Sequence, residues 1–372
     1  MSTKSQKKRV LVAMSGGIDS SVAAFLLKKQ GYECIGIYLN FWSDPSLTVN
    51  KKGMPENKCC SIETMNIARR IAGKLNMPFY VFNVCDRFKK QVVDYFIDTY
   101  AKCETPNPCV ECNRSIKFGF LFERMKQLKA DYIATGHYAK IREKKGVYEL
   151  LIGRDEIKDQ TYFLYTLTQD KLKHVLFPLG DYEKKDSRKI AKKIKLEEII
   201  EKRESQGICF FPDKKYEDFL KRYFPKDLLK QGPIETIDGK KIGTHGGLQF
   251  FTVGQRKGIE IGGEKEPLYV VKLDYKRNAL IVGRNKDTFQ SGFGVDQVTF
   301  TEKSFKKGEY NIHARIRYRF PPEKAMLKIK TKKTGEIYFK KPQRAITPGQ
   351  SVVFYKNKKV LGGGVIKQVF MV

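Results

Sequence analysis

The chain has 372 residues and carries 72 lysines and arginines against 41 aspartates and glutamates, a net charge of +31. Its length predicts two or three domains, and its charge favours a polyanionic partner, nucleic acid first, although a lysine-rich composition alone gives a similar excess. No apolar stretch is long enough to span a membrane, and residues 1–8 lack the apolar centre of a secretory signal, which excludes a membrane protein and predicts a cytoplasmic one.

Strand-like and helix-like segments alternate through the first half of the chain and predict a doubly wound parallel sheet covered by helices, an α/β fold. Strands are expected at 9–14, 34–40, 79–83 and 131–135. Helices are expected at 20–30, 60–75, 87–101, 115–128 and 185–193. Ligands of such sheets bind at the carboxyl ends of the strands, so the segments after the first and fourth strands are expected to face one ligand.

After residue 217 the pattern changes to short strands separated by glycine, proline and aspartate turns. Hairpin turns are expected at 237–240 and 332–335, and barrel strands near 311–319, 325–331, 335–340, 351–355 and 364–370. Three domains are therefore predicted: an α/β domain over 1–217, a small mixed β domain over 218–290 and an antiparallel β-barrel over 291–372. The last carries 18 lysines and arginines against 5 acidic residues, which suits a module that contacts RNA.

A glycine-rich turn, 15–21 (SGGIDSS), lies between the first expected strand and the first expected helix. Two glycines let backbone N–H groups approach an anion and the helix adds its positive dipole end, so the turn predicts a phosphate cradle rather than a turn that only packs. No Gly-Lys-Ser/Thr follows, which excludes a loop for γ-phosphoryl transfer. The turn resembles the pyrophosphate loop of the ATP pyrophosphatases, which cleave ATP between the α- and β-phosphates to adenylate a substrate.

Eight cysteines in a reducing compartment are expected to be redox-active, nucleophilic or metal-bound rather than structural disulfides. Cys103, Cys109 and Cys112 cluster ahead of the helix expected from Ser115. A cysteine beside a helix N-terminus and Arg114 is expected to have a lowered thiol pKa and to supply a thiolate.

A further cysteine, Cys209, lies far downstream between a glycine and two aromatic residues. We expect a tight turn there, which presents the sulfur while its flanks anchor in the core. Cys59 and Cys60 precede a helix, where a structural role is favoured over sulfur acceptance, and Cys34 and Cys85 are expected in the core.

Seven short sequence motifs occur along the chain, and their order as well as their residues can be compared with those of known families. They are 15–20 (SGGIDS), 107–113 (NPCVECN), 135–138 (TGHY), 158–164 (KDQTYFL), 207–210 (GICF), 254–258 (GQRKG) and 317–319 (RYR). Their types and order resemble those of the tRNA-specific 2-thiouridylases, bacterial enzymes that place sulfur on C2 of the wobble uridine of tRNA. The resemblance continues to 347–350 and 362–364, so it covers nearly the whole chain.

The resemblance implies a role for each residue that matches a family motif. ATP would be bound by Ala13, Met14, Ser15, Gly16, Gly17, Ile18, Asp19 and Ser20, with Leu39 and Gly136 beside the adenine. Asp19 would help to hold Mg²⁺, although capping the helix is an equally good role for it. tRNA would be contacted by Asn107, Pro108, Cys109, Lys158, Asp159, Gln160, Arg317 and Tyr318, the arginine binding phosphate and the tyrosine stacking.

The resemblance also implies a reaction. Adenylation by ATP would turn the C2 oxygen of a flipped-out uridine into a leaving group, with release of AMP and pyrophosphate. Cys209 would carry a persulfide supplied by a sulfur-donor protein, either a persulfide carrier or a cysteine desulfurase. Cys112 would then attack Cys209, and the two cysteines would end as a redox disulfide.

One position departs from the family pattern, because Cys109 stands where better-known members have aspartate. The change removes a candidate acid/base carboxylate and creates an alternative. Cys109, Cys112 and Cys209 would instead hold a 4Fe-4S cluster whose exposed iron binds sulfide, or zinc together with Cys103. Two readings of another class stay open: a small-molecule adenylating ligase, which needs no cysteine pair, and a non-catalytic RNA-binding protein, which needs no phosphate cradle.

Overall fold

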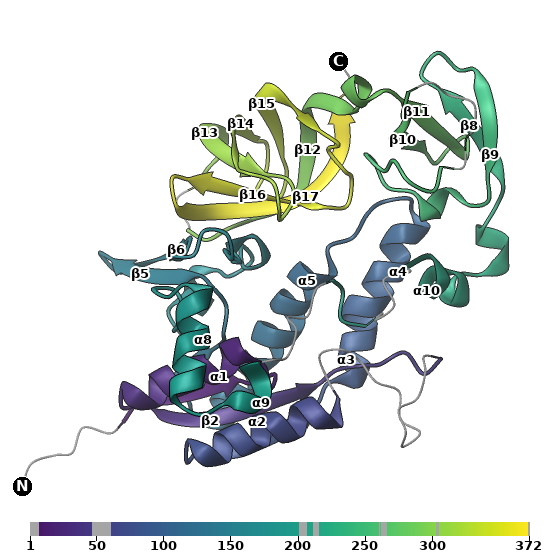
Figure 1. Cartoon of the computed structure of the whole chain (residues 1–372). Coiled ribbons are helices and arrows are strands. Elements are labelled where there is room, and N and C mark those ends of the chain that lie inside the picture. Colours follow the sequence, from purple (N-terminus) through teal and green to yellow (C-terminus); the bar gives the residue numbers. More distant parts are fainter. Residues whose placement is uncertain are drawn as a thin grey trace, which may run out of the picture.

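The computed structural model describes residues 7–46, 61–200, 207–210, 216–259, 261, 266–302 and 305–370, apart from the side chains of residues 197, 198 and 226. Cys59 and Cys60 lie outside the described residues. An α/β body contains the N-terminal part of the chain, and two β-rich bodies lie beyond it (Figure 1). In the described part, no helix has both the length and the apolar character that crossing a membrane requires.

A five-stranded parallel sheet with the order β3-β2-β1-β4-β7 forms the centre of the α/β body. Its strands are β1 (Arg9–Ala13), β2 (Glu33–Asn40), β3 (Phe79–Asn83), β4 (Tyr132–Ala134) and β7 (Val175–Leu176). The first four confirm the strands expected from the sequence. The chain builds outward from β1 to β3 and then returns to the other side of β1, which makes the sheet doubly wound with its switch point between β1 and β4.

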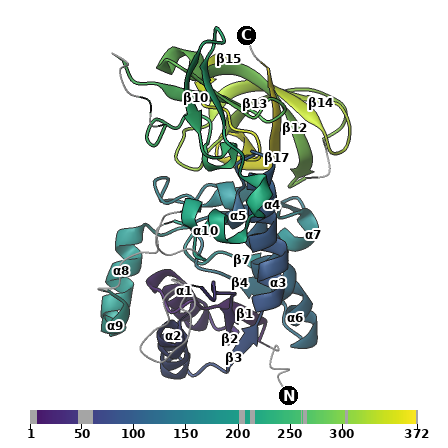
Figure 2. The ribbon, with the colours of Figure 1, turned by 90° about the vertical axis from the view of Figure 1, so that its right-hand side faces the viewer.

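Helices cover both faces of this sheet (Figure 2). Successive side chains along each strand point to opposite faces, so each face carries apolar residues that must be covered. Val10 and Val12 pack in one cluster, while Leu11, Ile35 and Ile37 pack in the other. The first cluster takes residues from α1 (Ile18–Lys29), α2 (Ile62–Lys74), α8 (Lys184–Lys193) and α9 (Glu197–Ile200). The second takes residues from α3 (Cys85–Phe88), η1 (Lys89–Val93), α4 (Asp94–Ala101), α5 (Pro108–Glu111), η2 (Cys112–Phe120), α6 (Leu121–Gln127) and α7 (Gln169–Leu172).

A four-stranded sheet with the order β10-β11-β8-β9 forms the second body. It follows α10 (Tyr216–Tyr223) and contains β8 (Gly232–Thr236), β9 (Lys241–His245), β10 (Tyr269–Asp274) and β11 (Ala279–Gly283). β8 and β9 are antiparallel and β8 and β11 are parallel, so the sheet is mixed, and the hairpin turn expected at 237–240 joins β8 to β9. Three short helical turns flank these strands: η4 (Lys226–Leu228), η5 (Leu248–Phe250) and η6 (Asn285–Thr288).

Six antiparallel strands close into the C-terminal barrel, because the first of them pairs with the last as well as with β15. They are β12 (Phe289–Phe300), β13 (Gly308–Arg315), β14 (Glu323–Ile329), β15 (Gly335–Arg344), β16 (Ser351–Lys356) and β17 (Lys359–Phe370). Five correspond to expected strands, whereas β12 was not predicted. Two glycines and three register shifts, one against β15 and two against β17, interrupt its alternating pattern. Gly292 lies close to β15, where an added Cβ would be 2.8 Å from the carbonyl oxygen of Ile337.

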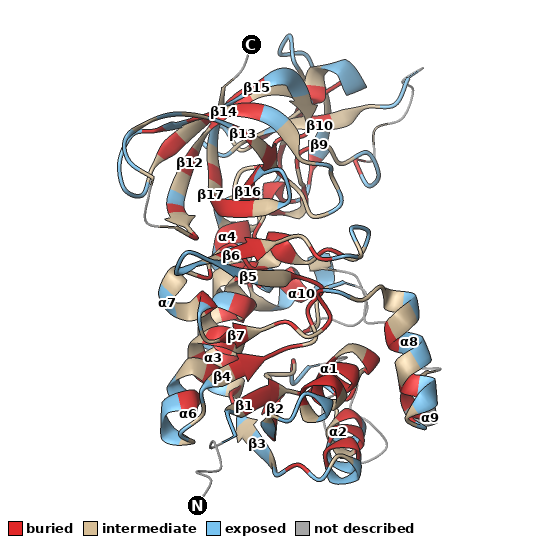
Figure 3. Ribbon diagram, turned by 90° about the vertical axis from the view of Figure 1, so that its left-hand side faces the viewer, coloured by how far each residue is buried: buried red, intermediate tan, exposed pale blue. Residues whose placement is uncertain are grey.

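The barrel has its own hydrophobic core, and three of its residues also join the core of the α/β body. Val353, Tyr355 and Val360 of the barrel belong to the same buried cluster as the helices beneath the parallel sheet, and the buried layer continues between the two bodies (Figure 3). An unpredicted hairpin of β5 (Lys140–Lys144) and β6 (Val147–Leu151) also extends the barrel sheet, through the pairing of Leu151 with Lys359. The barrel therefore packs directly against the α/β body.

Candidate active site

The glycine-rich turn after β1 is held by its own hydroxyl groups. The Ser15 N–H donates to Oγ of Ser20 at 3.2 Å, and Oγ of both Ser20 and Ser21 donates to the Gly17 carbonyl, at 3.1 and 2.8 Å. Gly16 has φ +71°, and a Cβ there would lie 2.4 Å from the Thr64 carbonyl oxygen. The turn thus needs glycine at its apex and presents the N-terminus of α1, as a phosphate cradle requires.

The residues expected around the nucleotide lie at one edge of the sheet. Leu39 is near the end of β2, Gly136 follows β4, and these two strands flank β1, from which the cradle follows. Gly136 touches the cradle itself, because a Cβ on it would lie 2.6 Å from the Asp19 carbonyl carbon and 2.7 Å from the Ser20 nitrogen. The structure therefore brings the predicted nucleotide residues together at the switch point.

Asp19 does not cap α1. The N-cap is Gly17. The Asp19 carboxylate accepts hydrogen bonds from the Tyr138 hydroxyl at 2.9 Å and from the Lys184 ammonium at 2.8 Å to each oxygen. Sequence reasoning missed Lys184, because no local motif links a lysine at the start of α8 to a loop 165 residues earlier.

The helix that carries Cys112 begins earlier than expected. It starts at Pro108, with Oδ1 of Asn107 accepting from the Val110 N–H at 3.3 Å, and continues through η2. Asn followed by Pro is a helix-start signal, so the expectation of a non-helical segment up to Ser115 was wrong. Asn107 and Pro108 are buried, Cys109 is exposed and Cys112 is half-buried in the second turn.

The guanidinium of Arg114 binds the Glu111 carboxylate, at 2.9 and 2.6 Å, rather than standing free beside a thiol. The ion pair with Glu111 reduces the net positive charge that Arg114 would present to a neighbouring thiol. The lowered thiol pKa expected at Cys112 stays a prediction.

Cys209 follows a tight turn, as expected, since Gly207 has φ +92°. The next residue, Phe210, is 1 % exposed and packs against Phe88, Phe96 and Phe219, with ring centroids 5.9, 5.3 and 5.6 Å away. Cys112 and Cys209 both pack, half-buried, against the hydrophobic cluster under the parallel sheet. Two cysteine segments far apart in the sequence thus lie on one core.

A buried aspartate fixes the helix that follows Cys209. Asp44, beyond the end of β2, has a fully buried side chain that accepts from Arg222 at 2.7 Å and from Tyr223 at 2.9 Å, both on α10. Burial opposes ionisation, but bonds from Ser46, Arg222 and Tyr223 outweigh it and lower the pKa of Asp44. The Asp44 ion pair ties the carboxyl end of β2 to α10, and Phe219 of that helix packs against Phe210, the neighbour of Cys209.

Replacing Asp44 by asparagine should loosen this connection. The variant removes the carboxylate that pairs with Arg222, at an expected cost of about 1–3 kcal/mol in unfolding free energy. We expect a lower melting temperature and faster alkylation of Cys209, measured by calorimetry and by peptide mass spectrometry. Asp181→Asn is the matched control, because the Asp181 side chain is 71 % exposed; equal alkylation rates in both variants would contradict this role.

No group of three or more His, Cys, Asp or Glu side chains among the described residues is arranged to hold a metal ion. In this conformation Cys109, Cys112 and Cys209 are therefore not arranged to bind an iron–sulfur cluster. Cys103 packs against the core of the second body instead, and burial raises its thiol pKa to about 12. The zinc set that included Cys103 is thus not assembled.

Among the residues expected to contact tRNA, Asp159 is buried. Its carboxylate is 1 % exposed, accepts from both the N–H and the hydroxyl of Thr161, and pairs with Arg315 of the barrel at 2.9 Å. In this structure the buried carboxylate joins the α/β body to the barrel, and the RNA contact expected at Asp159 stays a prediction. Gln160 accepts from the Tyr138 N–H at 2.9 Å, and Lys158 is half-buried beside it.

Arg317 is likewise committed to protein partners. Nη2 donates to the carbonyls of Val253 and Ala345 at 3.0 and 3.1 Å and to the Thr347 hydroxyl at 2.6 Å. This nitrogen joins the second body to the barrel, and the phosphate contact expected from Arg317 stays a prediction. Tyr318, half-buried, packs on Phe163 with ring centroids 4.6 Å apart.

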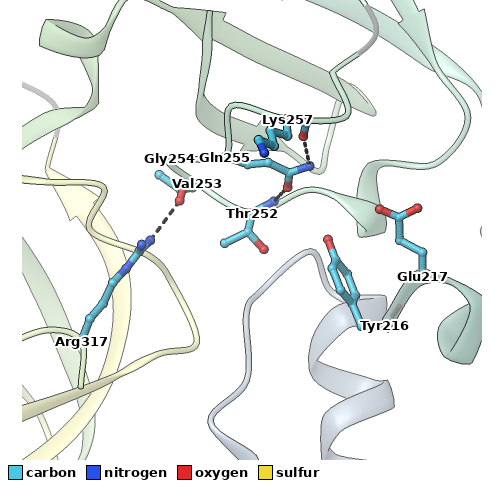
Figure 4. Close-up of a pocket in the computed structure, with 8 residues that line it drawn as sticks. All are labelled: Tyr216, Glu217, Thr252, Val253, Gly254, Gln255, Lys257 and Arg317. Atoms are coloured by element: carbon cyan, nitrogen blue, oxygen red, sulfur yellow. Dashed lines mark hydrogen bonds between the residues drawn. The ribbon is translucent and has the colours of Figure 1, made fainter. Parts of the chain in front are cut away.

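A cavity of about 380 Å³ opens at this junction (Figure 4). It is lined by Tyr216, Glu217, Thr252, Val253, Gly254, Gln255, Lys257 and Arg317. The GQRKG segment forms one wall, and Thr252 accepts a hydrogen bond from Thr105, ahead of the Cys112 helix, at 3.3 Å. None of the phosphate-loop residues lines this cavity, so it is separate from the nucleotide edge.

Truncation of Arg317 should therefore reduce the stability of the fold more than it changes tRNA binding. Arg317→Ala leaves the Val253 and Ala345 carbonyls without this donor, at an expected cost of about 1–3 kcal/mol. We expect a lower melting temperature and an unchanged salt dependence of tRNA binding, measured by calorimetry and by filter binding at several ionic strengths. Arg319→Ala, at an exposed neighbour, is the control for stability. A flatter salt dependence with unchanged melting would restore the phosphate contact.

Comparison with known proteins shows which protein family the chain belongs to. The tRNA methyl transferase HUP domain model matches residues 8–213, the tRNA methyl transferase PRC-barrel domain model 217–284, and the aminomethyltransferase beta-barrel domain model 290–366. The tRNA-specific 2-thiouridylase MnmA 2 of Clostridium tetani is 44% identical over 97% of this chain and 99% of its own length. MnmA 1 of Caldanaerobacter subterraneus is 45% identical over 97% and 98%, and MnmA of Clostridium perfringens 41% over 98% and 99%. The chain therefore belongs to the tRNA-specific 2-thiouridylase family.

Proposed function

We propose that this protein, a tRNA sulfurtransferase by its family, thiolates C2 of the wobble uridine through an adenylated intermediate and a persulfide on Cys209. The observation that carries the proposal is the pairing of two features: a phosphate cradle at the switch point, and two cysteine segments packed on the core beneath the same sheet. The full-length relationship supplies the substrate class, a tRNA uridine.

The nucleotide would bind with its phosphates on residues 13–20 and its adenine between Leu39 and Gly136. The cradle supplies backbone N–H groups and a helix N-terminus to the phosphates. Asp19 is the carboxylate that would hold Mg²⁺, which supplies positive charge to the phosphates, and its side chain is 35 % exposed and thus within reach of a ligand. The uridine C2 oxygen attacks the α-phosphorus, and pyrophosphate leaves.

The sulfur step uses both cysteines. The terminal sulfur of the Cys209 persulfide attacks C2 and expels AMP, which leaves the base joined to Cys209 through a disulfide. Cys112 thiolate then attacks Sγ of Cys209, so that the bond to the transferred sulfur breaks and 2-thiouridine is released. The resulting Cys112–Cys209 disulfide needs two electrons from a dithiol reductant, and a sulfur-donor protein supplies the next persulfide.

tRNA would lie across the basic barrel and the segments of the α/β body beside it. The barrel range 291–372 has an excess of 13 positive charges, which favours a phosphate backbone. Asn107 and Pro108 are buried and would position exposed Cys109 toward the base, while Lys158 and Tyr318 remain the proposed contacts near the barrel. The proposed reaction would take place in the cytoplasm.

Incubation of the protein with ATP, a persulfide donor and unmodified tRNA tests the proposal. Nucleoside mass spectrometry should detect 2-thiouridine, with one AMP formed per thiolated base. AMP without thiolated nucleoside would favour an adenylating ligase, and tRNA binding without AMP would favour a non-catalytic RNA-binding protein. Iron and acid-labile sulfide, measured on anaerobically purified protein, decide the cluster route; full activity without iron would eliminate that route.

A further inference from the structure

The ion pair between Asp19 and Lys184 brings a cation to a phosphate loop that has none of its own. Residues 13–21 contain no lysine or arginine. Nζ of Lys184 lies 2.8 Å from each carboxylate oxygen of Asp19, and the Lys184 side chain is 12 % exposed. Lysine is seldom buried to this extent without a specific partner, so its position beside the cradle calls for a physical reason.

Several contacts hold Lys184 in place. Its backbone N–H donates to Asp155 at 2.9 Å, and the preceding residue, Glu183, forms a reciprocal capping box with Asp186. The Tyr138 hydroxyl lies 2.9 Å from both Asp19 on the cradle and Ser187 on α8. The start of α8 is thus anchored to the cradle by more than the lysine ammonium, which leaves the ammonium able to exchange its partner without releasing the helix.

We propose that Lys184 binds the pyrophosphate portion of ATP and that the Asp19 carboxylate occupies its ammonium in the absence of nucleotide. The inference rests on the proposed use of ATP at this loop. The hydroxyls of Ser20 and Ser21 hold the loop carbonyl of Gly17, so the cradle itself offers phosphate mainly backbone N–H groups and the helix dipole. A lysine ammonium adds the full positive charge that stabilises pyrophosphate as it leaves the α-phosphorus.

Calorimetric titration with inorganic pyrophosphate in EDTA tests this role without Mg²⁺ or tRNA. Lys184→Met should weaken pyrophosphate binding about tenfold or more, because one charge-assisted contact is lost. Lys185→Met is the matched control: it removes the same charge from the next residue of the helix, and the Lys185 side chain is 68 % exposed and pairs with Glu183 at 2.6 Å. Lys184→Arg keeps the charge and should lose less affinity than Lys184→Met. Melting temperatures of the variants show that each is folded.

The double variant Asp19→Asn/Lys184→Met separates direct binding from mere neutralisation of Asp19. If Lys184 binds phosphate, the double variant stays clearly weaker than the wild type, even though Asp19→Asn removes a carboxylate that repels pyrophosphate. Pyrophosphate affinity restored to the wild-type value would mean that the lysine only offsets the carboxylate, and it would overturn the proposal. An unchanged affinity in Lys184→Met, or no pyrophosphate binding by the wild type, would overturn it as well. Failure of tRNA thiolation alone would leave this result standing, since no tRNA is present.

Discussion

We expect Cys209→Ser to abolish 2-thiouridine formation and to leave tRNA binding intact. A serine hydroxyl cannot carry a transferable sulfur, so the sulfur donor has no acceptor in the variant. Its effect on structure should be small, because serine is of similar size and Cys209 is half-buried at the end of a turn that Gly207 and Phe210 already fix. Nucleoside mass spectrometry and filter binding measure the two results.

Cys85→Ser is the matched control for this prediction. Cys85 is also half-buried, and its sulfur contacts the Asn40 carbonyl at 3.6 Å, a bond that a serine hydroxyl retains. Burial raises the pKa of the Cys85 thiol, so it is not poised as a thiolate. Thiolation by Cys209→Ser at a rate similar to that of Cys85→Ser would show that sulfur reaches the base without a persulfide on Cys209.

Gly136→Ala should cause the second large loss, that of ATP binding. An added Cβ would lie 2.6 Å from the Asp19 carbonyl carbon, 2.7 Å from the Ser20 nitrogen and 2.9 Å from the Asp19 carbonyl oxygen. All three are backbone atoms, so the first turn of α1 must shift. The N–H groups of the cradle would then no longer point at the phosphates. We expect ATP affinity to fall by about 100-fold or more, the loss of two or more aligned contacts, as measured by calorimetry.

Gly73→Ala is its control, because Gly73 lies in α2 and an added Cβ would meet nothing within 4 Å apart from the adjacent backbone of its own helix. Alanine in a helix interior stabilises by about 0.5–1 kcal/mol relative to glycine, so this variant should bind ATP normally and melt slightly higher. Normal ATP binding by Gly136→Ala would mean that the nucleotide does not depend on the contact between the TGHY segment and the cradle.

The sequence predicts the strands that position the site better than the partners within it. The alternation that places Val10 and Leu11 on opposite faces can be recognised within a few residues of sequence. The glycine turn and the TGHY segment each follow a strand, and the carboxyl ends of parallel strands lie at the same edge of the sheet. The barrel strands were found for the same reason, whereas β12 was missed because Gly292 and Gly294 break its pattern. Local periodicity suffices where a segment has one buried face.

The partners of charged residues could not be predicted, because they come from distant parts of the chain. Asp44 meets Arg222, Asp159 meets Arg315 and Asp19 meets Lys184, and each pair is joined only by the fold. The RYR and KDQ segments were expected at the tRNA surface, yet Arg317 and Asp159 join the domains. A charged motif in the sequence does not distinguish an RNA contact from an interdomain bond until the burial of its side chains is known.

The most direct test of the account is the state of Cys112 and Cys209 after one turnover. The protein is loaded with persulfide, mixed with ATP and tRNA in the absence of reductant, quenched with an alkylating reagent and digested for peptide mass spectrometry. We predict a disulfide-linked peptide containing Cys112 and Cys209 in an amount equal to the 2-thiouridine formed. Thiolated tRNA accompanied by alkylated Cys112 and Cys209, with no linked peptide, would contradict the proposed sulfur transfer.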